Sequence, residues 1–154
     1  MRDFNDADRI RKDERITLPE NPGNLSPEAL AQLEAAVKAS LQDGYLSCPV
    51  GWKLAKEAGV SKVVIGEITD RLGVRITNCQ LGCFKVEKTP YDETQEKQSA
   101  AEVVAGVQAL RDKNELNCVN VFDLAHRLKV APMAVADAVN ELGLKIRNCQ
   151  LGCF

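Results

Sequence analysis

Two 13-residue segments of this chain are almost the same and lie 70 residues apart. The first, Leu72 to Phe84, reads LGVRITNCQLGCF, and the second, Leu142 to Phe154, reads LGLKIRNCQLGCF. When the ungapped alignment is extended upstream to Leu46 and Leu116, 15 of 39 positions are identical. A fixed period of this kind indicates that one small fold has been duplicated, so both copies should share one structure.

The duplication divides the 154 residues into two units of roughly 60 residues, and a unit of that size is only marginally stable alone. We expect a flexible arm over residues 1–25, a first unit over 26–84, a linker over 85–98 and a second unit over 99–154. Prolines and a glycine end the arm in LPENPGNL, and the linker is charged and contains Pro90.

The composition is that of an ordinary globular protein, with 45% hydrophobic and 27% charged residues. Acids and bases alternate in the first residues, where a signal peptide would need an apolar run, and no stretch is long enough to span a membrane. We therefore expect a cytoplasmic protein with reduced cysteines and no membrane partner. The 20 basic and 22 acidic side chains nearly cancel, so nucleic-acid binding would need a local basic patch.

The periodicity of apolar residues predicts a mostly α fold with short β-strands. Ser26, Pro27 and Glu28 carry the signals of a helix start, namely a capping hydroxyl, a proline in the first turn and an early acid. In the first copy we expect helices over 26–43, 50–58 and 62–72, with strands over 45–48 and 74–78. In the second copy we expect helices over 100–113, 121–128 and 132–142, with strands over 116–118 and near the end of the chain.

Six residues of the first copy fall at the spacing of a helix-turn-helix, with a small residue on the first helix and a glycine at the turn. They are Leu54, Ala55, Gly59, Val60, Ile65 and Ile68. With a helix before them and a strand after them, they resemble a winged-helix domain, and the second copy resembles it more weakly. Because Lys129 replaces the turn glycine there, we expect an adjusted turn in the second copy.

The resemblance implies that the helix over 62–72 enters the major groove of DNA and that nearby cations contact phosphates. The residues it places at the groove are Ser61, Lys62, Val63, Gly66, Glu67, Thr69 and Asp70, and those it places near phosphates are Lys53, Lys56, Arg71, Arg75 and Lys85. The matching second-copy surface, which includes Pro132, Met133 and Ala136, offers no cation to phosphate. We expect that surface to pack against the other copy or a second chain rather than to read DNA.

Each copy has three cysteines in equivalent places, and they are Cys48, Cys79 and Cys83, then Cys118, Cys149 and Cys153. Free cysteine is among the most buried residue types, so structural thiols are the favoured interpretation. A zinc or iron–sulfur site and a redox-sensing site are the alternatives. Along a straight strand Cys79 and Cys83 would stand about 13 Å apart, so a shared ion would require Leu81 and Gly82 to turn the chain back.

These observations favour a DNA-binding transcription regulator of winged-helix type that contacts DNA mainly through the first repeat. The alternative is a protein–protein interaction module built from winged helices, with or without a cysteine-ligated metal or redox-sensing site. DNA, another protein and a second copy of the chain are all compatible partners, and no cofactor is expected outside the alternative. No nucleophile with a paired base and no phosphate-binding loop is evident, so we do not expect an enzyme.

Overall fold

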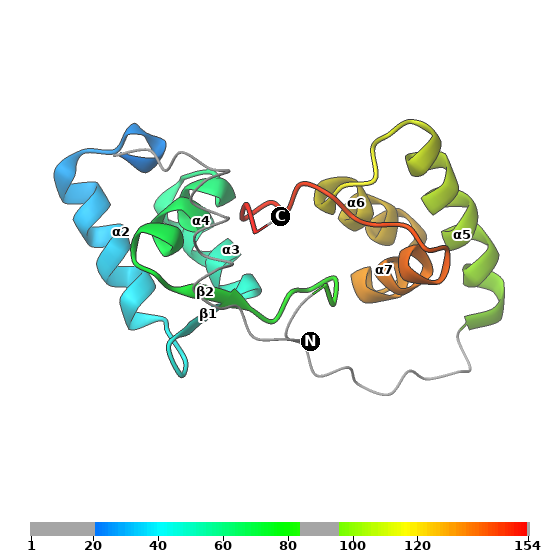
Figure 1. Ribbon diagram of the computed structural model, residues 1–154, viewed down its shortest axis with the longest axis horizontal. Helices are drawn as coiled ribbons and strands as arrows, with labels where there is room; N and C mark the ends of the chain where they lie inside the picture. The colour runs from blue at the N-terminus through cyan, green and yellow to red at the C-terminus, as the bar shows by residue number, and fades with distance from the viewer. Residues whose placement is uncertain (1–20, 84–95, 154) are drawn as a thin grey trace. The chain divides into compact units, whose positions relative to one another are not determined.

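The computed structural model describes residues 21–83 and 96–153, with side chains from residue 101 onward in the second stretch. The chain divides into two compact units, Met1–Thr77 and Asn78–Phe154. Their described residues are mostly helical, with one sheet of two short strands (Figure 1). The predicted mostly α fold with short strands is therefore confirmed. Most of the expected arm and linker lies outside the described residues.

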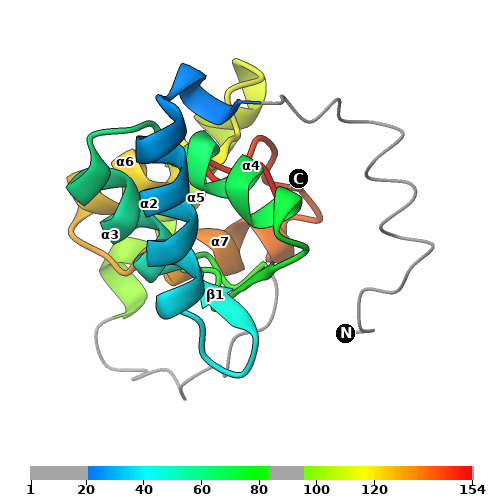
Figure 2. The same ribbon diagram turned by 90° about the vertical axis from the view of Figure 1, so that its left-hand side faces the viewer.

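The first unit is built from three α-helices, α2 (Pro27–Ala39), α3 (Cys48–Ala58) and α4 (Lys62–Arg71). A short 3-10 helix, η1 (Pro22–Asn24), precedes them and lies against α4. Helix α2 lies across α3 and α4 (Figure 2). The core side chains of these helices include Leu33, Val37, Leu54, Ile65 and Ile68. Full burial of such a side chain contributes about 1.5–3 kcal/mol, so this apolar stripe accounts for much of the unit's cohesion.

The predicted start of α2 is confirmed in detail. The Ser26 hydroxyl accepts a hydrogen bond from the backbone N–H of Ala29 at 3.1 Å, and Pro27 occupies the first turn. The helix ends at Ala39, earlier than the predicted residue 43, because the chain needs Leu41 to Gly44 to reverse into the first strand. A left-handed backbone at Asp43 and Gly44 makes that reversal.

The two strands of the first unit are β1 (Tyr45–Ser47) and β2 (Arg75–Thr77), and they pair in parallel with Leu46 opposite Ile76. The strands predicted over 45–48 and 74–78 are therefore both present, each slightly shorter. In the second unit the same pairing is reduced to one parallel bridge between Asn117 and Arg147, positions that match Ser47 and Thr77. The bridge is bounded by hydrogen bonds from Cys118 N–H to Arg147 and from Arg147 N–H to Leu116.

The second unit contains α5 (Glu96–Asp112), α6 (Cys118–Leu128) and α7 (Pro132–Glu141), each packed against the other two (Figure 1). Its core includes Val107 of α5, Val121 and Leu124 of α6, and Val135 and Val139 of α7. Gly106 on α5 permits close packing, because an added Cβ would stand 2.6 Å from a methyl carbon of Leu124. The three predicted helices of this copy are therefore present.

Cys79 and Leu81 of the first sequence copy belong to the core of the second unit. Their side chains are only 5% and 2% exposed, and they pack in one cluster with α5, α6 and α7. The sequence placed the end of the first unit at Phe84, whereas the structure divides the chain after Thr77. The repeat in the sequence and the compact unit in space therefore have different boundaries.

The turn between α6 and α7 keeps the conformation of the turn between α3 and α4. Gly59 and Lys129 both adopt a left-handed backbone, with φ of 66° and 55°. The N–H groups of Val60 and Val130 then donate to the carbonyls of Ala55 and Ala125, each at 3.0 Å. The adjusted turn expected at Lys129 was wrong, because the packing of the helices holds a lysine in the backbone conformation that glycine adopts freely.

Among the described residues, no helix combines the length and the apolar character needed to cross a membrane.

Candidate functional site

Most of the proposed DNA-contacting residues lie on the α3–turn–α4 segment, and Arg75 lies on β2. The structure exposes some of them and buries others. Exposed are Lys53, Lys56, Ser61, Val63 and Arg71, partly buried are Lys62, Glu67, Asp70 and Arg75, and fully buried are Gly66 and Thr69. Lys85 lies outside the described residues. The cations of α3 therefore remain on the surface, while the middle of α4 is covered.

Thr69 and Gly66 lie in the buried part of α4. The Thr69 hydroxyl donates to the backbone carbonyl of Gly66 at 2.7 Å, which satisfies the hydroxyl inside the helix. Thr69 is only 1% exposed. These two residues are consequently not on an accessible face, although the winged-helix resemblance placed them at the DNA groove with Lys62 and Val63.

Two of the predicted phosphate-contacting cations, Lys53 and Arg71, and the predicted groove residue Lys62 have partners within the first unit. Lys62 Nζ lies 3.5 Å from the centre of the Trp52 ring, an arrangement in which the cation is attracted to the π face. Lys53 Nζ lies 3.7 Å from Glu57 Oε1, and Arg71 Nε lies 3.7 Å from Glu34 Oε1. The local charge of this surface is therefore mixed, in keeping with the balanced composition.

The corresponding face of α7 in the second unit is covered by the turn that follows Asn78. Ala136 is 1% exposed and shares a core cluster with Cys79 and Leu81. A Cβ added to Gly82 would stand 3.6 Å from Cγ of Met133, so the backbone of that turn lies against the start of α7. The sequence predicted that this face would pack against the other copy or against a second chain. The turn that lies on it belongs to the first sequence copy.

The sequence CQLGC folds into the same tight turn in both copies, and we call residues 79–83 and 149–153 the CQLGC turns. In each turn the glycine N–H donates to the carbonyl of the first cysteine at 2.9 Å, from Gly82 to Cys79 and from Gly152 to Cys149. The glycines have φ of 68° and 71°, the left-handed conformation that such a reversal requires. The chain therefore reverses at Leu81 and Gly82, which the sequence allowed but did not require.

The reversal brings the two thiols of each CQLGC turn within hydrogen-bonding distance. The Cys83 thiol donates to the sulfur of Cys79, and this bond lowers the pKa of Cys79 to about 6 although burial opposes it. The same bond raises the pKa of Cys83. The hydrogen bond from Cys153 likewise lowers the pKa of Cys149 to about 6. In each turn the second cysteine is therefore the donor and the first cysteine the acceptor.

Cys118 is the first residue of α6 and has a different environment. Its side chain is buried, and its sulfur accepts a hydrogen bond from Gln150 Nε2 at 3.5 Å. Burial raises the pKa of Cys118 and the bond from Gln150 opposes that rise. Gln150 was not singled out from the sequence, although its identity in both copies, as Gln80 and Gln150, was a signal that could have found it.

The thiols of the second unit are close enough to influence one another electrostatically. A charge on Cys149 raises the pKa of both Cys79 and Cys118.

Cys48 is buried at the first position of α3 in the first unit. No group of three or more His, Cys, Asp or Glu side chains within the described ranges is arranged to hold a metal ion. The favoured interpretation as buried thiols fits Cys48, Cys79 and Cys118, whereas Cys83 is exposed.

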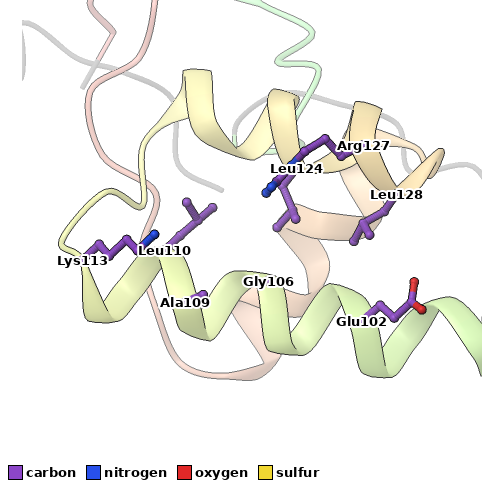
Figure 3. A pocket seen from close by; sticks show the side chains of 8 residues that line it. All are labelled: Glu102, Gly106, Ala109, Leu110, Lys113, Leu124, Arg127 and Leu128. Carbon is purple, nitrogen blue, oxygen red and sulfur yellow. The ribbon is translucent and has the colours of Figure 1, made fainter.

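An open groove of about 350 Å³ lies between α5 and α6 (Figure 3). Its floor is apolar and is made by Gly106, Ala109, Leu110, Leu124 and Leu128. Glu102, Lys113 and Arg127 line it with charged side chains.

A comparison of the chain with known protein families, curated proteins and solved structures finds no match.

Proposed function

We propose that this chain is a DNA-binding regulator built from two tandem helix-turn-helix units of winged-helix type, with DNA contacts mainly through the first unit. The observation that carries the proposal is the α3–turn–α4 segment, whose left-handed Gly59 sets two short helices at a tight turn. Exposed Lys53 and Lys56 on α3, with Ser61 at the start of α4, offer donors to phosphates beside that turn.

The ion pairs on this surface do not prevent phosphate binding. Surface pairs such as Lys53 with Glu57 are worth about 0–1 kcal/mol, and the two side chains are 72% and 59% exposed. A phosphate can therefore replace the glutamate at small cost. Because the whole chain has a formal net charge of −2, the affinity would come from these few local contacts and would depend strongly on salt.

The second unit supports the first in this proposal and does not read DNA. Its α7 carries Met133 and Ala136 where α4 carries Val63 and Gly66, and the first CQLGC turn covers them. The positions of Lys53 and Lys56 are taken by Asp123 and His126. The second unit therefore lacks the two α3 cations on which the proposal rests.

A protein-interaction module is the second candidate, and one observation favours it. Val63 is 44% exposed at the start of α4, while Gly66 and Thr69 behind it are buried. An apolar side chain in that position contributes little to contacts with phosphate, whereas it suits a contact with an apolar partner surface.

Fluorescence anisotropy of the full chain with mixed-sequence duplex DNA, measured across salt concentrations, tests the principal proposal. We expect binding that weakens steeply as salt rises. In the variant carrying Lys53→Glu and Lys56→Glu, we expect weaker binding and a salt slope reduced by about one for each lysine that contacts a phosphate.

The matched control carries Lys113→Glu and Arg127→Glu, which change the net charge equally on exposed residues of the second unit. This control should bind DNA nearly as the unmodified chain does. Equal loss in both variants would show a nonspecific effect of charge and would contradict a site on the first unit. Absence of binding at low salt would refute the DNA proposal and leave the protein-interaction module.

A further inference from the structure

The CQLGC turns place two pairs of sulfur atoms side by side by means of backbone geometry alone. The turn hydrogen bonds, at 2.9 Å in both copies, and the left-handed glycines fix the reversal. Asn78 and Asn148 before the turns also have positive φ, 51° and 52°, so the same backbone is repeated at both sites. A local turn is sufficient to bring together cysteines that are four residues apart.

We propose that each CQLGC turn is a redox-active dithiol that closes to an intramolecular disulfide, Cys79–Cys83 in one turn and Cys149–Cys153 in the other. This inference goes beyond DNA binding and does not depend on it. A disulfide requires two cysteines held close together. The turn hydrogen bonds and the thiol hydrogen bonds from Cys83 to Cys79 and from Cys153 to Cys149 provide that closeness.

The oxidant is a peroxide or a small disulfide such as oxidised glutathione. With hydrogen peroxide, the thiolate sulfur of the first cysteine attacks one oxygen, the O–O bond breaks, and a sulfenic acid and hydroxide form. The second thiol then attacks that sulfur, the S–O bond breaks, and its proton leaves with the hydroxyl as water. In sum, two thiols and one peroxide give one disulfide and two water molecules.

The first cysteine of each turn is the attacking group. It accepts the hydrogen bond of the second cysteine, which stabilises its thiolate and retains the proton on the partner. Once the first sulfur is oxidised it no longer holds the partner's proton, so the second thiol is freed to react. Cys118 is not part of this chemistry, because it lies on α6 outside the CQLGC turns and its sulfur accepts a hydrogen bond from Gln150.

Peptide mapping of the full chain tests the proposal, since trypsin releases each pair on its own peptide. Cleavage after Arg75 and Lys85 isolates Cys79 with Cys83, and cleavage after Arg147 isolates Cys149 with Cys153. The reduced chain is treated with peroxide or with glutathione redox buffer, quenched in acid, and its remaining thiols are alkylated under denaturing conditions before digestion.

We expect both peptides to lose two hydrogen atoms and to escape alkylation, while Cys48 and Cys118 become alkylated. Cys83→Ser should remove the first bridge only and Cys153→Ser the second only, whereas the control Cys118→Ser should retain both. Alkylation of all six cysteines after oxidation, or peptides cross-linked between the turns or to Cys118, would overturn the proposal.

Discussion

The two copies turn from one helix into the next with the same backbone but with different residues. Gly59 and Lys129 both adopt the left-handed conformation, and the same hydrogen bond closes each turn at 3.0 Å. A left-handed backbone costs a residue with a side chain about 1–2 kcal/mol. The second copy bears that cost, which shows that packing between the helices determines the turn more strongly than the residue placed in it.

The strand pairing, unlike the turn, is not the same in the two copies. Three residue pairs join β1 and β2 in the first unit, whereas only Asn117 and Arg147 are paired in the second. The first CQLGC turn contributes Cys79 and Leu81 to the core of the second unit, in one cluster with α5, α6 and α7. Duplication of a sequence therefore did not give two units with the same inventory of contacts.

The largest effect is expected at Leu81. Leu81→Ala leaves a cavity in the core of the second unit and should destabilise it by about 2–5 kcal/mol. The volume-conserving control Leu81→Met should cost less than about 1.5 kcal/mol. Chemical unfolding monitored by circular dichroism measures both values. Near-equal stabilities of the two variants would show that Leu81 does not fill a packed site.

An intermediate effect on stability is expected at Gly106, where α5 packs closely against α6. Gly106→Ala would place a methyl carbon 2.6 Å from Leu124, and overpacking of this kind costs about 1–3 kcal/mol. The matched position in the first copy is Ala36 on α2, which tolerates a side chain already. Ala36→Gly should therefore destabilise as well, by about 0.5–1 kcal/mol, through helix propensity. A stabilising Gly106→Ala would contradict the close approach of α5 and α6.

A smaller and more diagnostic effect is expected from exchanging the two turn residues. Gly59→Lys should cost about 1 kcal/mol and Lys129→Gly should gain about as much, because only the left-handed backbone distinguishes them. An added Cβ at Gly59 meets nothing within 4 Å, so crowding does not contribute to the cost. Thermal unfolding measures the stability of both variants. A change of the same sign in both would contradict the claim that the left-handed backbone sets the difference.

The last prediction concerns the CQLGC turns and is read from the reactivity of their cysteines. The pKa of Cys149 is depressed in the folded chain from an ordinary 9.0 to about 6. Its thiolate therefore stabilises the fold above pH 9, and this stabilisation is lost as the pH falls from 9 toward 6. Alkylation of Cys149 by iodoacetamide should rise with pH through about 6 and then level off.

Cys153→Ala removes the donor, so the alkylation profile of Cys149 should move toward pH 9, whereas Cys153→Ser retains a donor and should move it less. Cys79 is 5% exposed and Cys149 is partly exposed, so Cys79 should react more slowly at every pH. Identical profiles in the alanine and serine variants would remove the hydrogen bond from the account of Cys149.

Much of the local structure was predictable because its causes are local. Ser26 and Pro27 begin α2 as capping chemistry requires, and the glycine at position 59 marks the end of α3. The burial of Leu81 is what its apolar side chain favours. Which core would receive it was not predictable, because the two copies carry similar apolar faces and the pattern names no partner.

The candidate sites were predictable only in part. The cysteines were identified, but the sequence alone allowed both an extended strand and a turn at Gly82, and only the backbone conformation decides between them. The exposed lysines of α3 agreed with their helical positions, whereas Gly66 and Thr69 were buried by packing that the spacing of residues does not encode. Features set by local sequence were therefore predictable, whereas features set by long-range contacts were not.

Hydrogen exchange of the full-length Leu81→Ala variant, followed by mass spectrometry, tests most directly the claim that the first CQLGC turn completes the second unit. The account predicts a loss of amide protection in α7, at residues 132–141, with α2 and α4 protected as in the unmodified chain. A loss of protection confined to α4, with α7 unchanged, would contradict it and return residues 78–83 to the first unit.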